Sequence, residues 1–268
     1  MRDAEGAIFV TGGSSGIGLA TARRLARAAA APKLALFARN PARLEQAAAL
    51  LRTDLPQADI RTFVLDVTDT AAVEAAVAAA AAALGSPHRV VLSAGITLTG
   101  RLDTVDLAEQ RGVMEVNYFG SLNMVRALVP RMQAGAKLAL VGSAAGLHGV
   151  YGYGGYAPSK FALRGLAEVL RVELQPRGIG VTLCLPPDTD TPMLEAEVPL
   201  RPAVTSHISA AAPAMSAEAV AAALVRGMEA GRFLVLPGLS VKLLYLFAPW
   251  IAPLLRWHQQ RLIRRLGE

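Results

Sequence analysis

Short apolar runs and longer segments of helical periodicity alternate along most of this chain. Seven apolar runs of strand length predict buried strands; in order they are AIFVT, KLALFA, IRTFVLD, HRVVL, KLALV, GIGVTLCL and FLVLP. Helical segments separate them, among them LATARRLARAAAA, PARLEQAAALLR, AAVEAAVAAAAAAL, residues 107–132, residues 156–174 and SAEAVAAALVRGMEAG. This alternation predicts an α/β fold with a doubly wound parallel sheet of about seven strands and helices on both faces.

A glycine-rich turn, GGSSGIG, joins the first predicted strand to the first helix. Gly12, Gly16 and Gly18 permit a tight turn and let the backbone approach a pyrophosphate at the helix N-terminus. A plain tight turn would have the same composition, but the position between strand and helix favours dinucleotide binding. We therefore expect a Rossmann-type sheet.

The end of the second strand indicates which dinucleotide is bound. A carboxylate about 20 residues after the glycine motif would hold a ribose 2′-hydroxyl, but the sequence has Ala38 and then Arg39 there. A guanidinium binds a 2′-phosphate through charge-assisted hydrogen bonds. We therefore expect NADP/NADPH rather than NAD, the alternative being that Arg39 is a solvated loop residue.

Two further turns follow predicted strands, at the edge where α/β sheets bind ligands. Asp66, at the end of the third strand, is expected to accept a hydrogen bond from an adenine amino group. Its alternative role is to cap the helix that begins after Asp69. The turn Ser93-Ala94-Gly95 is small enough for a nucleotide to lie against it, although an ordinary turn would have the same composition.

Three residues that can do chemistry together surround the fifth strand. Ser143 follows that strand, and Tyr156 and Lys160 are four residues apart at the start of a helix, which places them on one face. The ammonium is expected to favour the phenolate of Tyr156. The alternative is a solvated helix face. Tyr151 and Tyr153 have no lysine four residues on, so only Tyr156 has this partner.

Two helical segments make further predictions. Asn117 lies among apolar residues in EVNYFGSLNMV, and a buried amide needs partners. It either ties strands together through backbone hydrogen bonds or holds a water near the active site, and the two roles are compatible. The helix at 156–174 has apolar residues on more than one face, which predicts burial on both sides and a homo-oligomer.

Composition narrows the class of protein. With 268 residues and 53% apolar content, the chain can bury a sizeable core in one domain. The net charge is +6, but the basic residues are scattered, so we expect no nucleic-acid partner. Cys184 is the only cysteine, which excludes an internal disulfide and a thiolate metal site, and no metal is expected. The first residues lack the apolar segment of a signal peptide, which predicts a cytoplasmic protein.

The last thirty residues differ from the rest. We expect residues 1–238 to form the dinucleotide-binding domain, with a long loop at about 192–215 acting as a lid. In the tail, 239–268, the apolar stretch 243–255 is shorter than the about 20 residues that span a membrane. Its aromatic residues and the arginines that follow suit peripheral contact with the cytoplasmic face of a membrane. The alternative is a tail that closes the substrate pocket or a dimer seam.

Together these motifs resemble the short-chain dehydrogenase/reductase family over about residues 6–237. The matching residues are TGGSSGIG at 11–18, Asp66-Val67, Ala94-Gly95, the stretch NYFG from Asn117, Ser143, the Tyr156 and Lys160 pair, and a proline-led loop ending at Thr191. The resemblance implies that Tyr156 protonates a carbonyl oxygen, Ser143 hydrogen-bonds it, Lys160 binds the nicotinamide ribose and Asn117 holds a relay water. It implies cofactor contacts from Gly12, Ser14, Ser15, Gly16, Ile17, Gly18, Arg39, Asp66, Val67, Ala94, Gly95, Tyr156, Lys160, Pro186, Thr189 and Thr191. Ser93 stands where the family usually has Asn, and Pro187 where it usually has Gly.

Within the family, the segments FARN, FALRGLAEVL, PPDTDTP and TSHISAAAPAMSAEAVA resemble the 3-ketodihydrosphingosine reductases. That resemblance implies a lipid ketone substrate whose 3-keto group is reduced with NADPH. Two alternatives stay open: a reductase of another carbonyl, such as a 3-oxoacyl thioester, a steroid or a retinoid, and a catalytically idle dinucleotide-binding scaffold. His148, in GLHGV, either contacts a polar substrate head or lies exposed in a loop.

Overall fold

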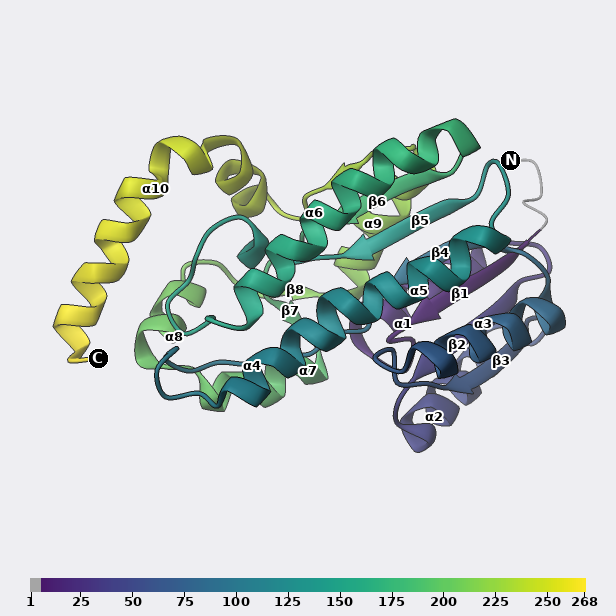
Figure 1. The fold of residues 1–268 in the computed structure, drawn as a ribbon, viewed down its shortest axis with the longest axis horizontal. Coiled ribbons are helices and arrows are strands. Elements are labelled where there is room, and N and C mark those ends of the chain that lie inside the picture. Colours follow the sequence, from purple (N-terminus) through teal and green to yellow (C-terminus); the bar gives the residue numbers. More distant parts are fainter. Residues whose placement is uncertain (1–5) are drawn as a thin grey trace.

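The computed structural model describes residues 6–268 and folds them around a seven-stranded parallel sheet (Figure 1). In spatial order the strands are β3 (Asp59–Val64), β2 (Lys33–Ala38), β1 (Ala7–Thr11), β4 (Pro87–Leu92), β5 (Lys137–Val141), β6 (Gly180–Cys184) and β9 (Leu234–Val235). Two short strands, β7 (Thr189–Asp190) and β8 (Met215–Ser216), pair separately. The predicted doubly wound sheet is confirmed.

Helices lie on both faces of the sheet, and each face has its own apolar core. The helices are α1 (Gly16–Arg27), α2 (Pro41–Asp54), α3 (Thr70–Leu84), α4 (Leu107–Met114), α5 (Gly120–Leu128), α6 (Tyr156–Leu174), α7 (Pro192–Glu197), α8 (Ala203–Ser209), α9 (Ala217–Glu229) and α10 (Leu239–Leu266). One core contains Val77 of α3 and Leu163 of α6, and the other contains Leu25 of α1 and Leu224 of α9. Burial of these apolar stripes accounts for the layered arrangement.

Two predicted boundaries are wrong. β3 ends at Val64 rather than Asp66, because the Asp66 carboxylate accepts hydrogen bonds from the N–H and hydroxyl of Thr68, 2.9 and 2.8 Å away, and turns the chain. The segment 192–215 is largely helical rather than a loop. The Thr191 hydroxyl accepts from the N–H of Leu194, and Pro192 occupies the first helical position, so α7 begins there.

The prediction that α6 is buried on both sides holds for one side only. Leu163 and Leu170 are buried, whereas Phe161, Val169 and Val172 are 43%, 52% and 73% exposed. The exposed apolar face lies where a subunit contact was predicted. The homo-oligomer itself stays a prediction.

Helix α10 is bent, and its second arm lies beyond α8, away from the sheet (Figure 1). The arms Leu239–Ala248 and Trp250–Leu266 meet at 109°. Across residues 6–268 no single helix has both the length and the hydropathy to cross a membrane, and the two arms of α10 reach that threshold only as a pair.

Candidate active site

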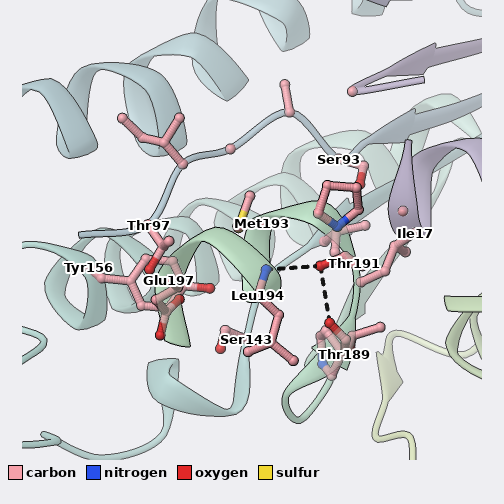
Figure 2. A pocket seen from close by; sticks show the side chains of 18 of the residues that line it. Ile17, Ser93, Thr97, Ser143, Tyr156, Thr189, Thr191, Met193, Leu194 and Glu197 are labelled. Carbon is pink, nitrogen blue, oxygen red and sulfur yellow. Dashed lines mark hydrogen bonds between the residues drawn. The ribbon is translucent and has the colours of Figure 1, made fainter. Parts of the chain in front are cut away.

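A cavity of about 980 Å³ opens at the carboxyl ends of the sheet strands. Most of the predicted site residues line it: Gly12, Ser14, Ser15, Gly16, Ile17, Arg39, Val67, Ala94, Gly95, Ser143, Tyr156, Lys160, Pro186, Thr189 and Thr191. Gly18, Asp66 and Asn117 are not part of its lining. Figure 2 shows Thr97, Tyr156 and Glu197 at one end of this cavity and Ile17, Ser93 and Thr191 at the other. The roles of these residues in binding and catalysis stay predictions.

The glycine turn has the shape that a pyrophosphate requires. Gly12 and Gly16 have φ angles of +65° and +53°, which residues other than glycine rarely adopt. A Cβ on Gly12 would lie 2.8 Å from the carbonyl of Ser93, so the two loops touch through their backbones. In the described part of the chain, Ser15 at the N-cap of α1 makes no side-chain capping bond. The N–H groups of this helix end are therefore available to an anion, and the residues present fit a dinucleotide.

The turn after β4 is held by backbone groups. The N–H groups of Ser93 and Ala94 both donate to the Thr11 hydroxyl, each at 3.1 Å. The turn is thus fastened to the end of β1 without the side chain of Ser93. This explains how a serine can replace the asparagine that the family pattern predicts there.

Asn117 is fully buried in a π-helical turn, η1 (Glu115–Phe119), between α4 and α5. Its amide accepts from the N–H of Ile96 at 2.9 Å and donates to the Ile96 carbonyl and the Ser159 hydroxyl at 3.0 and 2.9 Å. It therefore links the segment after β4 to α6, rather than two strands. Both amide hydrogens are used, and a relay water at Asn117 stays a prediction.

Ser143, Tyr156 and Lys160 converge from two elements. Ser143 follows β5, where its Oγ accepts from the N–H of Ala145 at 3.1 Å. Tyr156 and Lys160 lie on the first turns of α6, with the Lys160 Nζ 5.6 Å from the centre of the Tyr156 ring. The ammonium also donates to the Val141 carbonyl at 3.3 Å. The predicted shared face of the helix is present.

Burial has the largest effect on the pKa values of Tyr156 and Lys160. It raises the pKa of Tyr156 to about 12, against the opposing effect of the Ser143 hydroxyl and with smaller contributions from the carboxylates of Glu197 and Asp188. Burial lowers the pKa of Lys160 to about 8. The effect of the Lys160 ammonium on the phenolate stays a prediction, because burial has the largest influence on the pKa of Tyr156. Tyr156 keeps its proton at neutral pH, as a general acid must.

The structure contains a charged cluster near Tyr156 that the sequence analysis did not predict. The Tyr153 hydroxyl donates to Glu197 Oε1 at 2.5 Å, and Arg201 Nε donates to the same oxygen at 2.6 Å. Arg201 also pairs with Asp188 at 2.9 Å. The spacing of Glu197 and Arg201, four residues apart, was the available signal, but it lay in a segment treated as a loop.

Three other residues differ from expectation or add to it. His148 is partly buried and lines the cavity, so the exposed-loop alternative is wrong, and burial lowers the pKa of its imidazole. Arg43, one turn after Arg39, lines the same cavity. Asp66 does not cap α3, because Asp69 accepts the capping bond from the N–H of Ala72 at 2.9 Å.

The chain matches a family model described as short chain dehydrogenase over residues 6–200. A 3-dehydrosphinganine reductase of Arabidopsis thaliana is 38% identical over 233 residues, which are 85% of this chain and 68% of that protein. A 3-ketodihydrosphingosine reductase of Bos taurus is 35% identical, covering 84% of this chain and 69% of its own length. The crystal structure of levodione reductase superposes with a TM-score of 0.80 at 28% identity, covering 88% of this chain and 96% of its own. A short-chain dehydrogenase/reductase of Burkholderia phymatum in complex with NAD gives 0.79 at 26% identity, covering 93% and 96%.

Proposed function

The chain belongs to the short-chain dehydrogenase family, and from this premise we propose that it reduces 3-ketodihydrosphingosine to dihydrosphingosine with NADPH. The relatives described above carry that activity in their names. The observation that carries the proposal is the convergence of Ser143, Tyr156 and Lys160 in the same cavity as the glycine turn. This convergence speaks against the alternative of an idle scaffold.

The chain's own residues have distinct parts in the reaction. The reduced nicotinamide supplies a hydride, and the backbone of the glycine turn together with Thr189 and Thr191 would hold that cofactor. Tyr156 donates its hydroxyl proton to the oxygen of the ketone, and Ser143 donates a hydrogen bond to the same oxygen. Lys160 places a positive charge beside the phenol and would bind the nicotinamide ribose.

Part of the cavity suits a lipid chain. Apolar side chains line it from the loop after β5 and from the lid, namely Val150, Met193, Leu194, Ala196 and Ile208. Burial of an alkyl chain against them contributes about 0.8 kcal/mol per methylene. A long-chain ketone therefore gains affinity from this lid, and so would a retinoid.

A panel of ketones tests the proposal. NADPH oxidation is followed with 3-ketodihydrosphingosine, a 3-oxoacyl thioester, a 3-ketosteroid and a retinal. We expect the highest kcat/KM with 3-ketodihydrosphingosine. A higher value with any other member would transfer the function to that carbonyl, and no oxidation with any of them would revive the scaffold alternative.

Arg39 is proposed to select NADPH, with support from Arg43 on the first turn of α2. Charge-assisted hydrogen bonds to a phosphate contribute about 1.5–3 kcal/mol, so Arg39→Ala should raise the KM for NADPH by about tenfold or more. The KM for NADH should change by less than about twofold, since NADH lacks the phosphate. Steady-state kinetics with both cofactors measure this. Arg24→Ala, at an exposed arginine outside the cavity, is the control; an unchanged preference in Arg39→Ala would reject the role.

Helix α10 is proposed to contact the cytoplasmic face of a membrane. Leu246, Phe247 and Trp250 are 62%, 50% and 82% exposed, and arginines follow on the second arm. The same arm is anchored to the loop after β5, since Gln259 accepts from the N–H of Tyr151 at 2.9 Å and donates to the Gly149 carbonyl at 3.1 Å. Membrane contact and packing of the tail against the protein are thus compatible. One part of α10 is bonded to the loop after β5, and another part presents exposed apolar side chains.

Charges placed on that surface should weaken membrane binding. The double variant Phe247→Glu/Trp250→Glu is expected to bind vesicles of phosphatidylcholine and phosphatidylserine at least about tenfold more weakly, because two aromatic side chains no longer enter the lipid. Sedimentation with vesicles measures the bound fraction. Leu50→Glu, an exposed leucine on α2, is the matched control. Equal binding by the double variant and wild type would remove the membrane contact.

A further inference from the structure

Glu197 and Arg201, both buried, form an ionic cluster with the partly exposed Asp188 in the cavity that holds Tyr156. The Arg201 side chain is 5% exposed and that of Glu197 is 7% exposed. The guanidinium pairs with Glu197 at 2.6 Å and with Asp188 at 2.9 Å. Two carboxylates therefore share one cation, which leaves one negative charge in excess.

The described residues supply no second cation to compensate this excess charge. A buried carboxylate without full compensation is costly, and one carboxylate would be enough to pair Arg201. Tyr153 donates a hydrogen bond to Glu197 but carries no charge, because burial and the neighbouring Glu197 raise the pKa of its hydroxyl. Within residues 6–268, Arg201 is the only cation that pairs with either carboxylate.

The cluster lies beside the reacting group. The ring of Tyr153, whose hydroxyl contacts Glu197, has its centre 5.3 Å from that of Tyr156. Both carboxylates line the same cavity as Tyr156 and raise the pKa of its hydroxyl. A positive charge next to Glu197 would thus be close to the oxygen that Tyr156 protonates.

Two unpartnered polar atoms accompany the cluster. The Thr97 hydroxyl and the His148 Nδ1 are buried and have no hydrogen-bond partner among the described residues. Both residues line the same cavity as Tyr156 and Glu197, and Thr97 lies at the same end as these two in the view of Figure 2. Buried polar atoms of this kind are usually satisfied, and a polar ligand head would satisfy them.

We propose that this cluster is a headgroup subsite in which Glu197, supported by Asp188, binds a cationic amino group on the carbon next to the ketone. The inference rests on the proposed function and deepens it, since 3-ketodihydrosphingosine is an α-amino ketone with a hydroxyl group one carbon further on. The ammonium neutralises the excess charge, and Thr97 and His148 bind the hydroxyl. Steroids, retinoids and 3-oxoacyl thioesters have no ammonium at this position and leave the carboxylate uncompensated.

Two ketones of equal chain length test the subsite: the amino ketone, and an analogue in which hydrogen replaces the amino group. We expect wild type to favour the amino ketone by about 100-fold in kcat/KM, as for other buried charge pairs. Glu197→Gln keeps the acceptor for Tyr153 and removes the charge. It should lose most of that preference, so that kcat/KM falls at least about tenfold more for the amino ketone than for the deamino ketone.

Glu195→Gln is the matched control, since Glu195 lies two residues away on the same helix, is exposed and is outside the cavity lining; it should change neither rate. Asp188→Asn removes one charge at a side chain that is 32% exposed, and should give a smaller loss in the same direction even if Glu197→Gln does not fold.

The outcomes separate the subsite from the proposed function. Equal losses with both ketones in Glu197→Gln would assign the cluster to the structure of the lid and overturn the subsite. Equal rates of wild type with both ketones would also overturn it and leave the reductase function standing. If wild type reduces neither, the proposed function fails, and calorimetry with the amino diol and its deamino analogue still decides the subsite: tighter binding of the amino diol supports it, and equal binding overturns it.

Discussion

Tyr156→Phe should lower kcat/KM for the ketone by about 10³-fold, because general acid catalysis contributes about 10²–10⁴. The substitution removes the hydroxyl that donates the proton and keeps the ring, which lies 5.3 Å from the Tyr153 ring and under the Lys160 ammonium. The fold and the cofactor site are therefore expected to survive. Turnover is measured by NADPH oxidation and cofactor affinity by fluorescence titration.

The expected pattern is a loss of kcat with the Kd for NADPH within about twofold of wild type, since only the proton donor is gone. Tyr118→Phe is the matched control: it removes a phenol from η1 at a residue that does not line the cavity. More than about a tenth of wild-type activity in Tyr156→Phe would mean that another group supplies the proton. The same loss in Tyr118→Phe would point to a general sensitivity of the fold instead.

The sequence was sufficient for features that depend on neighbouring residues. Ser216 caps α9 and Gly85 ends α3 through bonds within a few positions, which serine and glycine at helix ends indicate, although the cap of α3 is Asp69 rather than Asp66. Ser143, Tyr156 and Lys160 share a cavity because the carboxyl ends of parallel strands lie at one edge of the sheet. Strand periodicity and chain order therefore predicted where they meet.

The sequence could not predict contacts between distant residues or the effect of burial on pKa values. The hydrogen bond between Tyr153 and Glu197 spans 44 residues, and Glu197 reaches it only because α7 folds over the cavity. Sequence spacing predicted only that Lys160 favours the phenolate of Tyr156, whereas burial of the phenol has the largest effect on its pKa. Burial of this kind is a property of the packed lid, and no local pattern reports it.

Gly18→Ala should weaken NADPH binding and destabilise the protein together, because Gly18 packs directly against Gly12 in the glycine turn. A Cβ there would lie 2.3 Å from the Gly12 carbonyl oxygen and 2.9 Å from its carbon, both of which are backbone atoms that cannot rotate away. Overpacking of this kind costs about 1–3 kcal/mol, and about 1.4 kcal/mol corresponds to tenfold in Kd. We expect a lower melting temperature and a Kd for NADPH raised by about tenfold or more.

Gly112→Ala is the matched control, in which the same substitution should raise stability instead of lowering it. A Cβ on Gly112, inside α4, would meet no atom within 4 Å, so alanine should stabilise the helix by about 0.5–1 kcal/mol. The Kd for NADPH should stay as in wild type, since Gly112 does not line the cavity. Thermal unfolding gives the melting temperature of each variant, and titration gives its Kd for NADPH. If Gly18→Ala melts and binds like wild type, the turn has room for a side chain, and the contact between Gly12 and Gly18 is not what requires glycine in this motif.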